Sequence, residues 1–215
     1  MKIGIIGTSC VGKTTYVNDF LKKWPMYETP QNSYREKLKE LNLPHSKQSN
    51  EETQTLILNC LIDQLIESSK KDFVIFDRSV VDVLAYSTWL NLYEKVSDKF
   101  LDQQRITIRE TLKLYDVLFF IPLTKVAPVN IEDNGFREVD PTYRQEIDTI
   151  FKVFNDSYAK GDGRVFPAED CPAVIEIFGS PEERIKLTEL YIMEDGKCYG
   201  EDQSLIPDII PATFK

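Results

Sequence analysis

The segment from Gly7 to Thr14 reads GTSCVGKT and matches the pattern GxxxxGK[ST]. It follows a short apolar run at residues 2–6 and precedes a helical pattern at residues 14–23, which is the strand, loop and helix context that the pattern requires. The two glycines let backbone N–H groups turn toward an anion, and the helix N-terminus adds further N–H groups and partial positive charge. This segment predicts a site for the phosphates of a nucleoside triphosphate.

Individual residues of this loop have separate expected roles. Lys13 should reach the β- and γ-phosphates, and the hydroxyl of Thr14 should bind the Mg²⁺ that bridges them, because a hard cation prefers oxygen ligands. The thiol of Cys10 is incidental, since that residue is expected to act mainly through its amide. The residues expected to contact ATP are Gly7, Ser9, Cys10, Val11, Gly12, Lys13, Thr14 and Thr15.

A second chemical feature is the sequence FDRS at residues 76–79, which ends an apolar run. Asp77 therefore lies at the carboxyl end of a strand, the edge where open α/β sheets bind ligands. Its carboxylate can either orient Mg²⁺ or accept the proton of an attacking hydroxyl, and the residue types leave both roles open. Arg78 carries a fixed charge with bidentate geometry, which suits a phosphoryl group.

Residues that could bind a phosphate acceptor are less sharply indicated. Asp82, Tyr86 and Trp89 share one face of the expected next helix, where they either line a pocket or belong to the core. Gln54 can read the edge of a base or lie on a solvated helix face, and Arg35 is a candidate substrate-side cation. The other polar groups of this region include Glu28 and His45; the histidine is expected to be structural or exposed rather than a base.

Alternating strand and helix patterns must position these residues. Apolar runs predict strands at 2–6, 72–77, 117–123 and 173–178, and helical spacing predicts helices at 14–23, 49–69, 79–95 and 98–115. A further apolar stripe at residues 147–158 ends at Gly161, and a closing helix runs from Ser180 to about residue 193. Capping boxes are expected at Ser49 with Glu52 and at Ser180 with Glu183. This alternation predicts an α/β protein whose parallel sheet is covered on both faces.

Bulk composition limits the remaining classes. A length of 215 residues fits one domain, which we assign to residues 1–193, followed by a tail at 194–215. The four scattered cysteines make a disulfide framework or zinc site improbable, and no apolar run is long enough to span a membrane, so we expect a cytoplasmic protein. A net charge of −9 argues mildly against a dedicated nucleic-acid binder. The oligomeric state is open, and a homodimer is compatible with the sequence.

Four segments together resemble a known family: GTSCVGKTT near the start, DRSVVDVLAY in the middle, then DNGFREVDPTYR and finally IEIFGSPEER. They are similar to P-loop kinases related to the nicotinamide riboside kinase domain of bifunctional NadR proteins, and more loosely to deoxynucleoside and thymidylate kinases. The resemblance covers roughly residues 1–190. It implies a three-layer P-loop fold with a five-stranded parallel sheet in the order 2-3-1-4-5, and a loop at Gly179 to Arg184 that contacts adenine.

The same resemblance implies a lid at about residues 124–144, whose arginines Arg137 and Arg144 lie over the phosphates. Positioned guanidinium groups would stabilise the charge of the transition state, and closure would exclude water. Lys125 is a weaker candidate for the same role. The expected catalytic residues are therefore Lys13, Asp77, Arg78, Arg137 and Arg144, with Thr14 and Asp77 at the metal and Arg35, Gln54 and Asp82 at the acceptor.

These features together predict a kinase that transfers the γ-phosphoryl group of ATP, with Mg²⁺, to a hydroxyl of a nucleoside or nucleotide. One alternative is a kinase of hydroxymethylated bases in viral DNA, because the resemblance extends to such enzymes. Another is a regulatory NTP-binding switch that signals by the position of its lid. The pairing of Asp77 and Arg78 with an arginine of the lid favours phosphoryl transfer over a switch.

Overall fold

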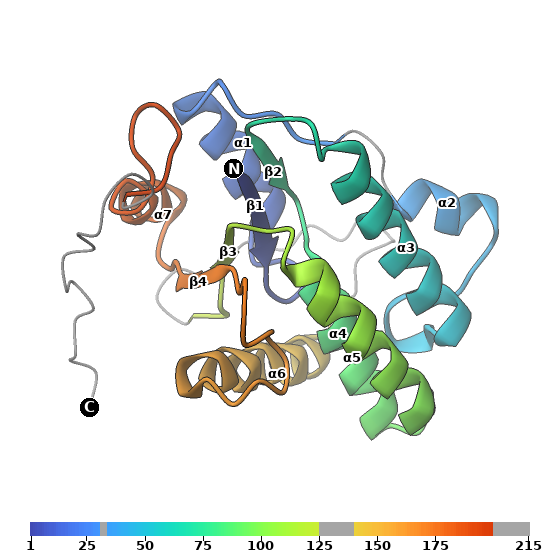
Figure 1. Cartoon of the computed structure of the whole chain (residues 1–215). Helices are drawn as coiled ribbons and strands as arrows, with labels where there is room; N and C mark the ends of the chain where they lie inside the picture. Colours follow the sequence, from blue (N-terminus) through green and yellow to red (C-terminus); the bar gives the residue numbers. More distant parts are fainter. Residues whose placement is uncertain (31–33, 125–139, 200–215) are drawn as a thin grey trace.

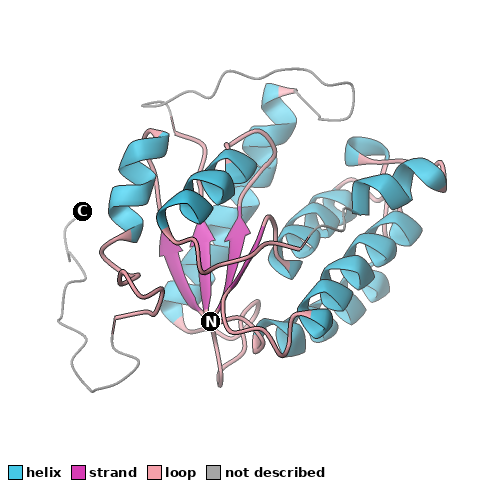
Figure 2. Cartoon of the chain, turned by 90° about the horizontal axis from the view of Figure 1, so that it is seen from above, coloured by secondary structure: helices cyan, strands magenta, loops and turns pink. Residues whose placement is uncertain are grey.

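The computed structural model describes residues 1–30, 34–124 and 140–199. Four parallel strands form one sheet in the order β2-β1-β3-β4, and Figure 2 shows the strands side by side with helices around them. Their bounds are β1 Lys2–Ile6, β2 Val74–Phe76, β3 Val117–Phe120 and β4 Ala173–Glu176. Each strand coincides with an apolar run of the sequence, so the four strands predicted from those runs are confirmed.

The expected fifth strand is absent from the described residues, and the expected order 2-3-1-4-5 is wrong in that detail. A single parallel bridge between Glu28 and Val74 lies at that edge of the sheet. Glu28 donates its N–H to Phe73 and accepts from Ile75, but Pro30, two residues further on, has no N–H to continue the ladder. If expected strand 2 is left out of the order 2-3-1-4-5, the remaining order 3-1-4-5 corresponds to the observed β2-β1-β3-β4.

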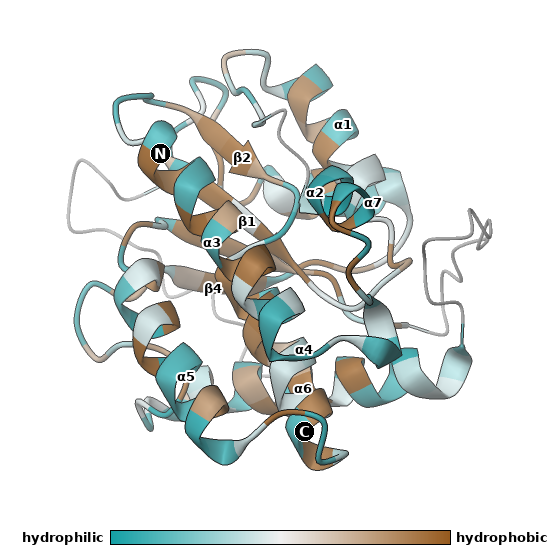
Figure 3. Ribbon diagram, turned by 90° about the vertical axis from the view of Figure 1, so that its right-hand side faces the viewer, coloured by the Kyte–Doolittle hydropathy of each residue, from teal (hydrophilic) through white to brown (hydrophobic). Residues whose placement is uncertain are grey.

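Helices cover both faces of the sheet, which confirms the three-layer architecture (Figure 1). On one face, Ile3 and Ile5 of β1 pack with α1 (Lys13–Lys23) and α7 (Pro181–Thr188). On the other face, Ile6 packs with α3 (Glu51–Glu67), α4 (Val80–Leu92), α5 (Asp98–Leu112) and α6 (Pro141–Lys160). The alternating contacts follow from the two-residue period of a strand, and Figure 3 shows the apolar colour of the strands between the helices.

Two short elements between α1 and α3 were not predicted from the sequence: α2 (Tyr34–Glu40) and the 3₁₀ turn Ser46–Gln48. Only Leu38 of α2 is buried, so this helix has no apolar stripe that a pattern search would detect. Both elements border the acceptor-side cavity described below. Among the described residues, no helix is both long and apolar enough to cross a bilayer.

The described start of the tail packs against the end of α1. Ile192 and Cys198 form an antiparallel bridge, and the hydroxyl of Tyr27 donates to the carbonyl of Gly196 at 2.6 Å. The indole Nε1 of Trp24 also donates to the carbonyl of Met193 at 2.8 Å. These buried aromatic side chains therefore hold residues 192–198 onto the α1 face of the sheet.

The caps of the helices agree with the sequence at α7 but not at α3. Ser180 and Glu183 form the predicted reciprocal capping box. At α3 the expected pair of Ser49 and Glu52 is wrong: Asn50 is the N-cap, and its side chain accepts from the N–H of Thr53 at 2.9 Å. Two adjacent residues can both cap a helix, and the chain path into the helix decided between them.

We expect Asn50→Ala to lower the free energy of unfolding by about 1 kcal/mol, because it leaves an N–H of the first turn of α3 unpaired. The measurement is chemical denaturation followed by circular dichroism. Ser49→Ala is the matched control and should change stability less. A larger loss for Ser49→Ala than for Asn50→Ala would contradict the observed cap.

Candidate active site

The phosphate loop joins β1 to α1 in a conformation that requires its glycines. Gly7 has φ of 143°, and a Cβ added there would lie 2.4 Å from the carbonyl oxygen of Ile121. Gly12 has φ of 86° and is the N-cap of α1, with no side-chain hydrogen bond to the first turn. The first turn of α1 therefore presents N–H groups that no capping side chain occupies, as an anion-binding helix start does.

Lys13 lies at the base of this loop with its side chain buried. Its Nζ donates to the carbonyls of Gly7 and Thr8, the latter at 2.7 Å. The same atom lies 3.6 Å from Oδ1 of Asp82 on α4, which gives a buried ion pair. Burial lowers the pKa of Lys13 to about 8, although the nearby Asp82 charge partly opposes this effect.

Two buried arginines bind the outer side of the loop. Nε of Arg144 donates to the carbonyl of Ser9 at 3.0 Å, and its Nη2 donates to the carbonyl of Cys10 at 3.2 Å. Arg184 of α7 donates through Nη1 to the carbonyl of Val11 at 2.7 Å. The sequence analysis did not identify Arg184 as a site residue. The only indication in the sequence was that Arg184 ends the segment expected to contact adenine.

Asp77 follows β2 and lies beside the loop, as the sequence predicted for an acid at a strand end. Its Oδ2 accepts from the hydroxyl of Thr14 at 2.6 Å. Two oxygen donors at this distance fit a hard cation such as Mg²⁺, whose other ligands can be phosphate oxygens and water. The described residues hold no group of three or more histidine, cysteine or acidic side chains that could bind a metal by themselves.

Arg78 has an unusual backbone and an aromatic surrounding. Its φ is 126°, a conformation that favours glycine, and its N–H donates to the carbonyl of Phe76 at 2.9 Å. The guanidinium carbon lies 5.6 Å from the ring centroid of Tyr34 and 5.7 Å from that of Tyr86. Such contacts orient a cation through the negative faces of the rings, so the strained backbone and two tyrosines together aim this arginine.

Two cavities meet at this position. The phosphate-side cavity is lined by the loop residues together with Arg35, Asp77 and Arg78. The acceptor-side cavity lies between α2, α3 and α4, and it shares Ser9, Arg35 and Arg78 with the first. The structure therefore brings both predicted arginines to the boundary between the two cavities.

The acceptor-side cavity combines aromatic walls with a few buried polar groups. Tyr34, Tyr86 and Tyr143 line it, and burial raises the pKa of the Tyr86 hydroxyl. Gln54 is only 3% exposed, and it lines this cavity. Asp82 is the one carboxylate among the described lining residues, and burial raises its pKa. This composition is typical of a small-molecule pocket.

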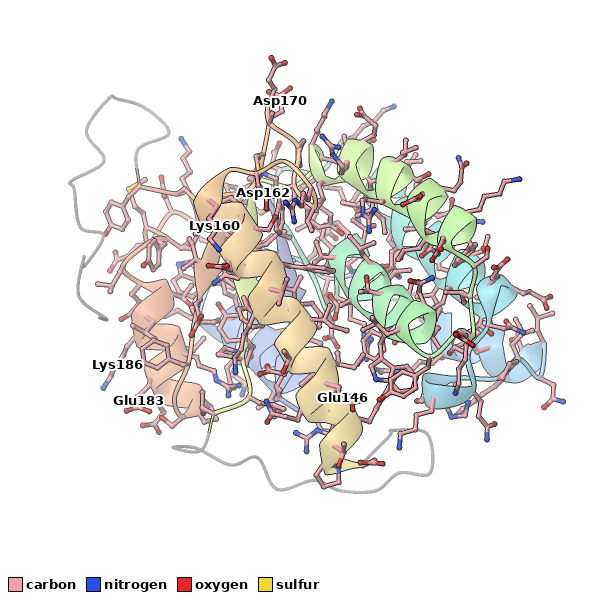
Figure 4. All side chains as sticks on the ribbon, turned by 90° about the horizontal axis from the view of Figure 1, so that it is seen from below. Glu146, Lys160, Asp162, Asp170, Glu183 and Lys186 are labelled. Atoms are coloured by element: carbon pink, nitrogen blue, oxygen red, sulfur yellow. The ribbon has the colours of Figure 1, made fainter. Side chains whose placement is uncertain are left out.

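Of the other residues considered in the sequence, Glu28 and Trp89 line neither cavity. Glu28 is exposed and pairs with Lys71 at 2.8 Å. Trp89 is buried, and its Nε1 donates at 2.7 Å to Glu146, which projects from α6 (Figure 4). Of the two roles considered for Trp89, its packing therefore favours a place in the core over the lining of a pocket. His45 lines the acceptor-side cavity. Arg137 and Lys125 lie outside the described residues.

The parallel sheet and the phosphate loop between β1 and α1 define a P-loop kinase-like α/β fold. A family model described as an AAA domain matches residues 2–158, and the chain belongs to this family. A search of curated proteins found no match to the chain.

Solved structures of P-loop kinases resemble this fold, which confirms the resemblance inferred from the motifs. Deoxyadenosine kinase from M. mycoides, solved with the products dCMP and dCDP, is 20% identical with a TM-score of 0.60, and the match covers 87% of this chain and 96% of the kinase. A NadR protein in complex with NR is 15% identical with a TM-score of 0.58, over 82% of this chain but 45% of NadR. Thymidylate kinase from Candida albicans is 16% identical with a TM-score of 0.55, over 87% and 89% of the two chains.

The lowered pKa of Lys13 predicts a pH-dependent contribution to stability. The unfolded chain keeps this lysine protonated up to its ordinary pKa of 10.5, whereas the folded chain releases the proton near pH 8. Between these values the unfolded state binds more protons, so the free energy of unfolding gains up to about 1.4 kcal/mol per pH unit from this group. Below pH 8 the burial of the charge opposes folding in full.

The measurement is urea denaturation of the wild type and Lys13→Met at pH values from 7 to 10.5. Because other groups titrate in both proteins, the informative quantity is their difference in free energy of unfolding, which should shift in favour of the wild type as pH rises. A difference that stays constant over this range would show that Lys13 keeps its ordinary pKa.

Proposed function

We propose that this protein is an ATP- and Mg²⁺-dependent kinase that transfers the γ-phosphoryl group to a hydroxyl of a nucleoside or nucleotide. The observation that carries the proposal is the meeting of a phosphate-side and an acceptor-side cavity at Arg35 and Arg78. A protein that only bound a nucleotide would need the first cavity but not the second. The solved kinases of similar fold, which act on nucleosides and nucleotides by their names, support the same class.

On the donor side, the loop N–H groups and Lys13 bind the β- and γ-phosphates of ATP. Lys13 must exchange one of its present partners, the carbonyls of Gly7 and Thr8 and the carboxylate of Asp82, for a phosphate oxygen. Thr14 and Asp77 would hold Mg²⁺, which would supply charge neutralisation for the phosphates. Asp77 lines only the phosphate-side cavity, which favours the metal-linked role over that of a base.

On the acceptor side, a flat ring stacks between tyrosine walls while the Gln54 amide pairs with its polar edge. A planar base provides the donor and acceptor groups that a buried amide needs, and an unpaired amide would be costly. Asp82 binds the acceptor hydroxyl through Oδ1, since Oδ2 accepts from the N–H of Ser79 at 3.1 Å. In this proposal Asp82 is the general base, a role that the sequence analysis had considered for Asp77.

The transfer itself joins these two sides. The acceptor oxygen forms a bond to the γ-phosphorus, the bond from that phosphorus to the β-phosphate oxygen breaks, and ADP leaves. The hydroxyl proton passes to the carboxylate of Asp82, whose raised pKa suits a proton acceptor. Arg78 and Arg35 stabilise the charge on the transferring group, because both lie where the cavities meet. Arg137 completes this set as a lid residue, as the resemblance implies.

The acceptor class can be tested directly by measuring ADP and inorganic phosphate formation from ATP. The assays contain ATP alone, a panel of nucleosides and nucleotides, or DNA with hydroxymethylated bases. We expect ADP without free phosphate, and only with one or more small acceptors. Stimulation by modified DNA alone would replace this proposal by a DNA-base kinase, and equal phosphate release with and without acceptors would indicate a regulatory switch. A cytoplasmic location is part of the same proposal.

We expect Asp77→Asn to lower turnover by more than tenfold, about 1.4 kcal/mol of barrier, and to raise the Mg²⁺ concentration for half-maximal rate. The amide keeps the size of the side chain but loses the charge that binds the cation. Asp102→Asn on the exposed face of α5 is the control and should leave both quantities unchanged. A turnover of Asp77→Asn within a few fold of the wild type would show that the carboxylate of Asp77 is not essential for catalysis.

We expect Gln54→Met to raise the KM for the acceptor about tenfold while the KM for ATP stays the same. The thioether fills the same volume but cannot pair with the edge of a base. Gln103→Met, on the exposed side of α5, is the matched control. Initial rates at varied acceptor and varied ATP separate the two constants, and an unchanged acceptor KM would mean that the amide does not contact the acceptor.

A further inference from the structure

Arg144 and Arg184 are buried, at 8% and 4% exposed, although arginine side chains usually keep the charged group in water. They come from two helices, α6 and α7, and both end on the carbonyls of the phosphate loop. Together they bind three consecutive carbonyls, those of Ser9, Cys10 and Val11. We call this arrangement the arginine clamp.

The clamp determines which way the loop N–H groups face. In a trans peptide the C=O of one residue and the N–H of the next point in opposite directions, and the described residues contain no cis peptide. The carbonyls of Ser9, Cys10 and Val11 point outward to the two guanidinium groups. The N–H groups of Cys10, Val11 and Gly12 therefore point to the opposite side, which is the direction required for binding phosphate.

The charges of the clamp are also unbalanced. No carboxylate of the described residues forms an ion pair with either arginine, and Nε of Arg184 has no hydrogen-bond partner there. Burial lowers the pKa of Arg184, and the nearby hydroxyl of Tyr16 opposes this effect only in part. Two buried cations directly behind an anion site attract a phosphate that approaches from the front.

Neither arginine lines the phosphate-side cavity or the acceptor-side cavity. Arg144 is therefore placed to act on the nucleotide through the loop, not by touching the transferring phosphoryl group as the resemblance implied. The rings of Tyr143 and Trp89 pack edge to face at 4.6 Å, and this packing helps to fix the start of α6 and hence Arg144.

We propose that Arg144 and Arg184 are positioning residues that preorganise the phosphate loop for the two phosphates common to ATP and ADP. The inference rests on the proposed function only in that the loop binds a nucleotide. Loss of the clamp weakens the binding of every ligand that places two phosphates on the loop, in the same proportion. An arginine of a lid would instead act on the γ-phosphate and would separate ATP from ADP.

The test measures the dissociation constants of Mg-ATP, Mg-ADP and inorganic pyrophosphate by calorimetry. For Arg144→Ala we expect all three to rise by about tenfold or more, since two charge-assisted hydrogen bonds are lost, while the ATP to ADP ratio stays unchanged. Arg184→Ala should show the same pattern with a smaller rise, because it removes one bond. Arg105→Ala, an exposed arginine that pairs with Asp102 on α5, should leave all three constants unchanged.

Arg144→Lys guards against a variant that fails to fold, because it keeps the charge but lacks the planar fork of donors with which Arg144 spans the carbonyls of Ser9 and Cys10. We expect an intermediate rise for the same three ligands. Unchanged constants in Arg144→Lys and either alanine variant would overturn the proposal, as would a rise confined to ATP or one that spares pyrophosphate. If the wild-type protein binds neither ATP nor ADP, the proposed function fails instead.

Discussion

The site depends on the direction of five peptide groups. The carbonyls of residues 7–11 all accept from buried cations, Lys13 on the near part of the loop and Arg144 and Arg184 on the far part. Backbone groups in a buried loop must be paired, and here the pairing also sets the opposite N–H groups toward the cavity. The glycines at positions 7 and 12 permit this path, and the cations hold it.

A second constraint links the donor and acceptor sides. Asp82 caps α4 through one oxygen and faces Lys13 through the other, so one carboxylate connects the start of a helix with the base of the phosphate loop. A buried ion pair is weak evidence for stability, because removing two charges from water opposes folding. Its position between the cavities gives it a clearer role in function, since both of its members contact the reacting groups in the proposed mechanism.

Local sequence predicted those features whose cause is local. The four strands, the phosphate loop and the cap at Ser180 each follow from an apolar run, a glycine spacing or a hydrogen bond three residues away. It failed at the cap of α3, where Asn50 replaced Ser49 because the path of the chain into the helix decided between two adjacent residues. The fifth strand was implied by the resemblance and not by an apolar run, and the described residues have only a bridge at Glu28 in its place. Helix α2 was not predicted because only Leu38 of it is buried, so the sequence lacks the recurring apolar residues from which a helix is recognised.

The sequence by itself determined the class of protein and the donor side, because a phosphate loop is built from consecutive residues whose types are sufficient to define it. The tertiary structure alone decided how the distant residues are used. It placed Arg78 between two tyrosines and brought Gln54 and Asp82 to the wall of the same cavity. It also brought Arg184 to the carbonyl of Val11, 173 positions earlier in the chain. Such contacts depend on how helices pack on a common sheet, and no spacing along the chain encodes them.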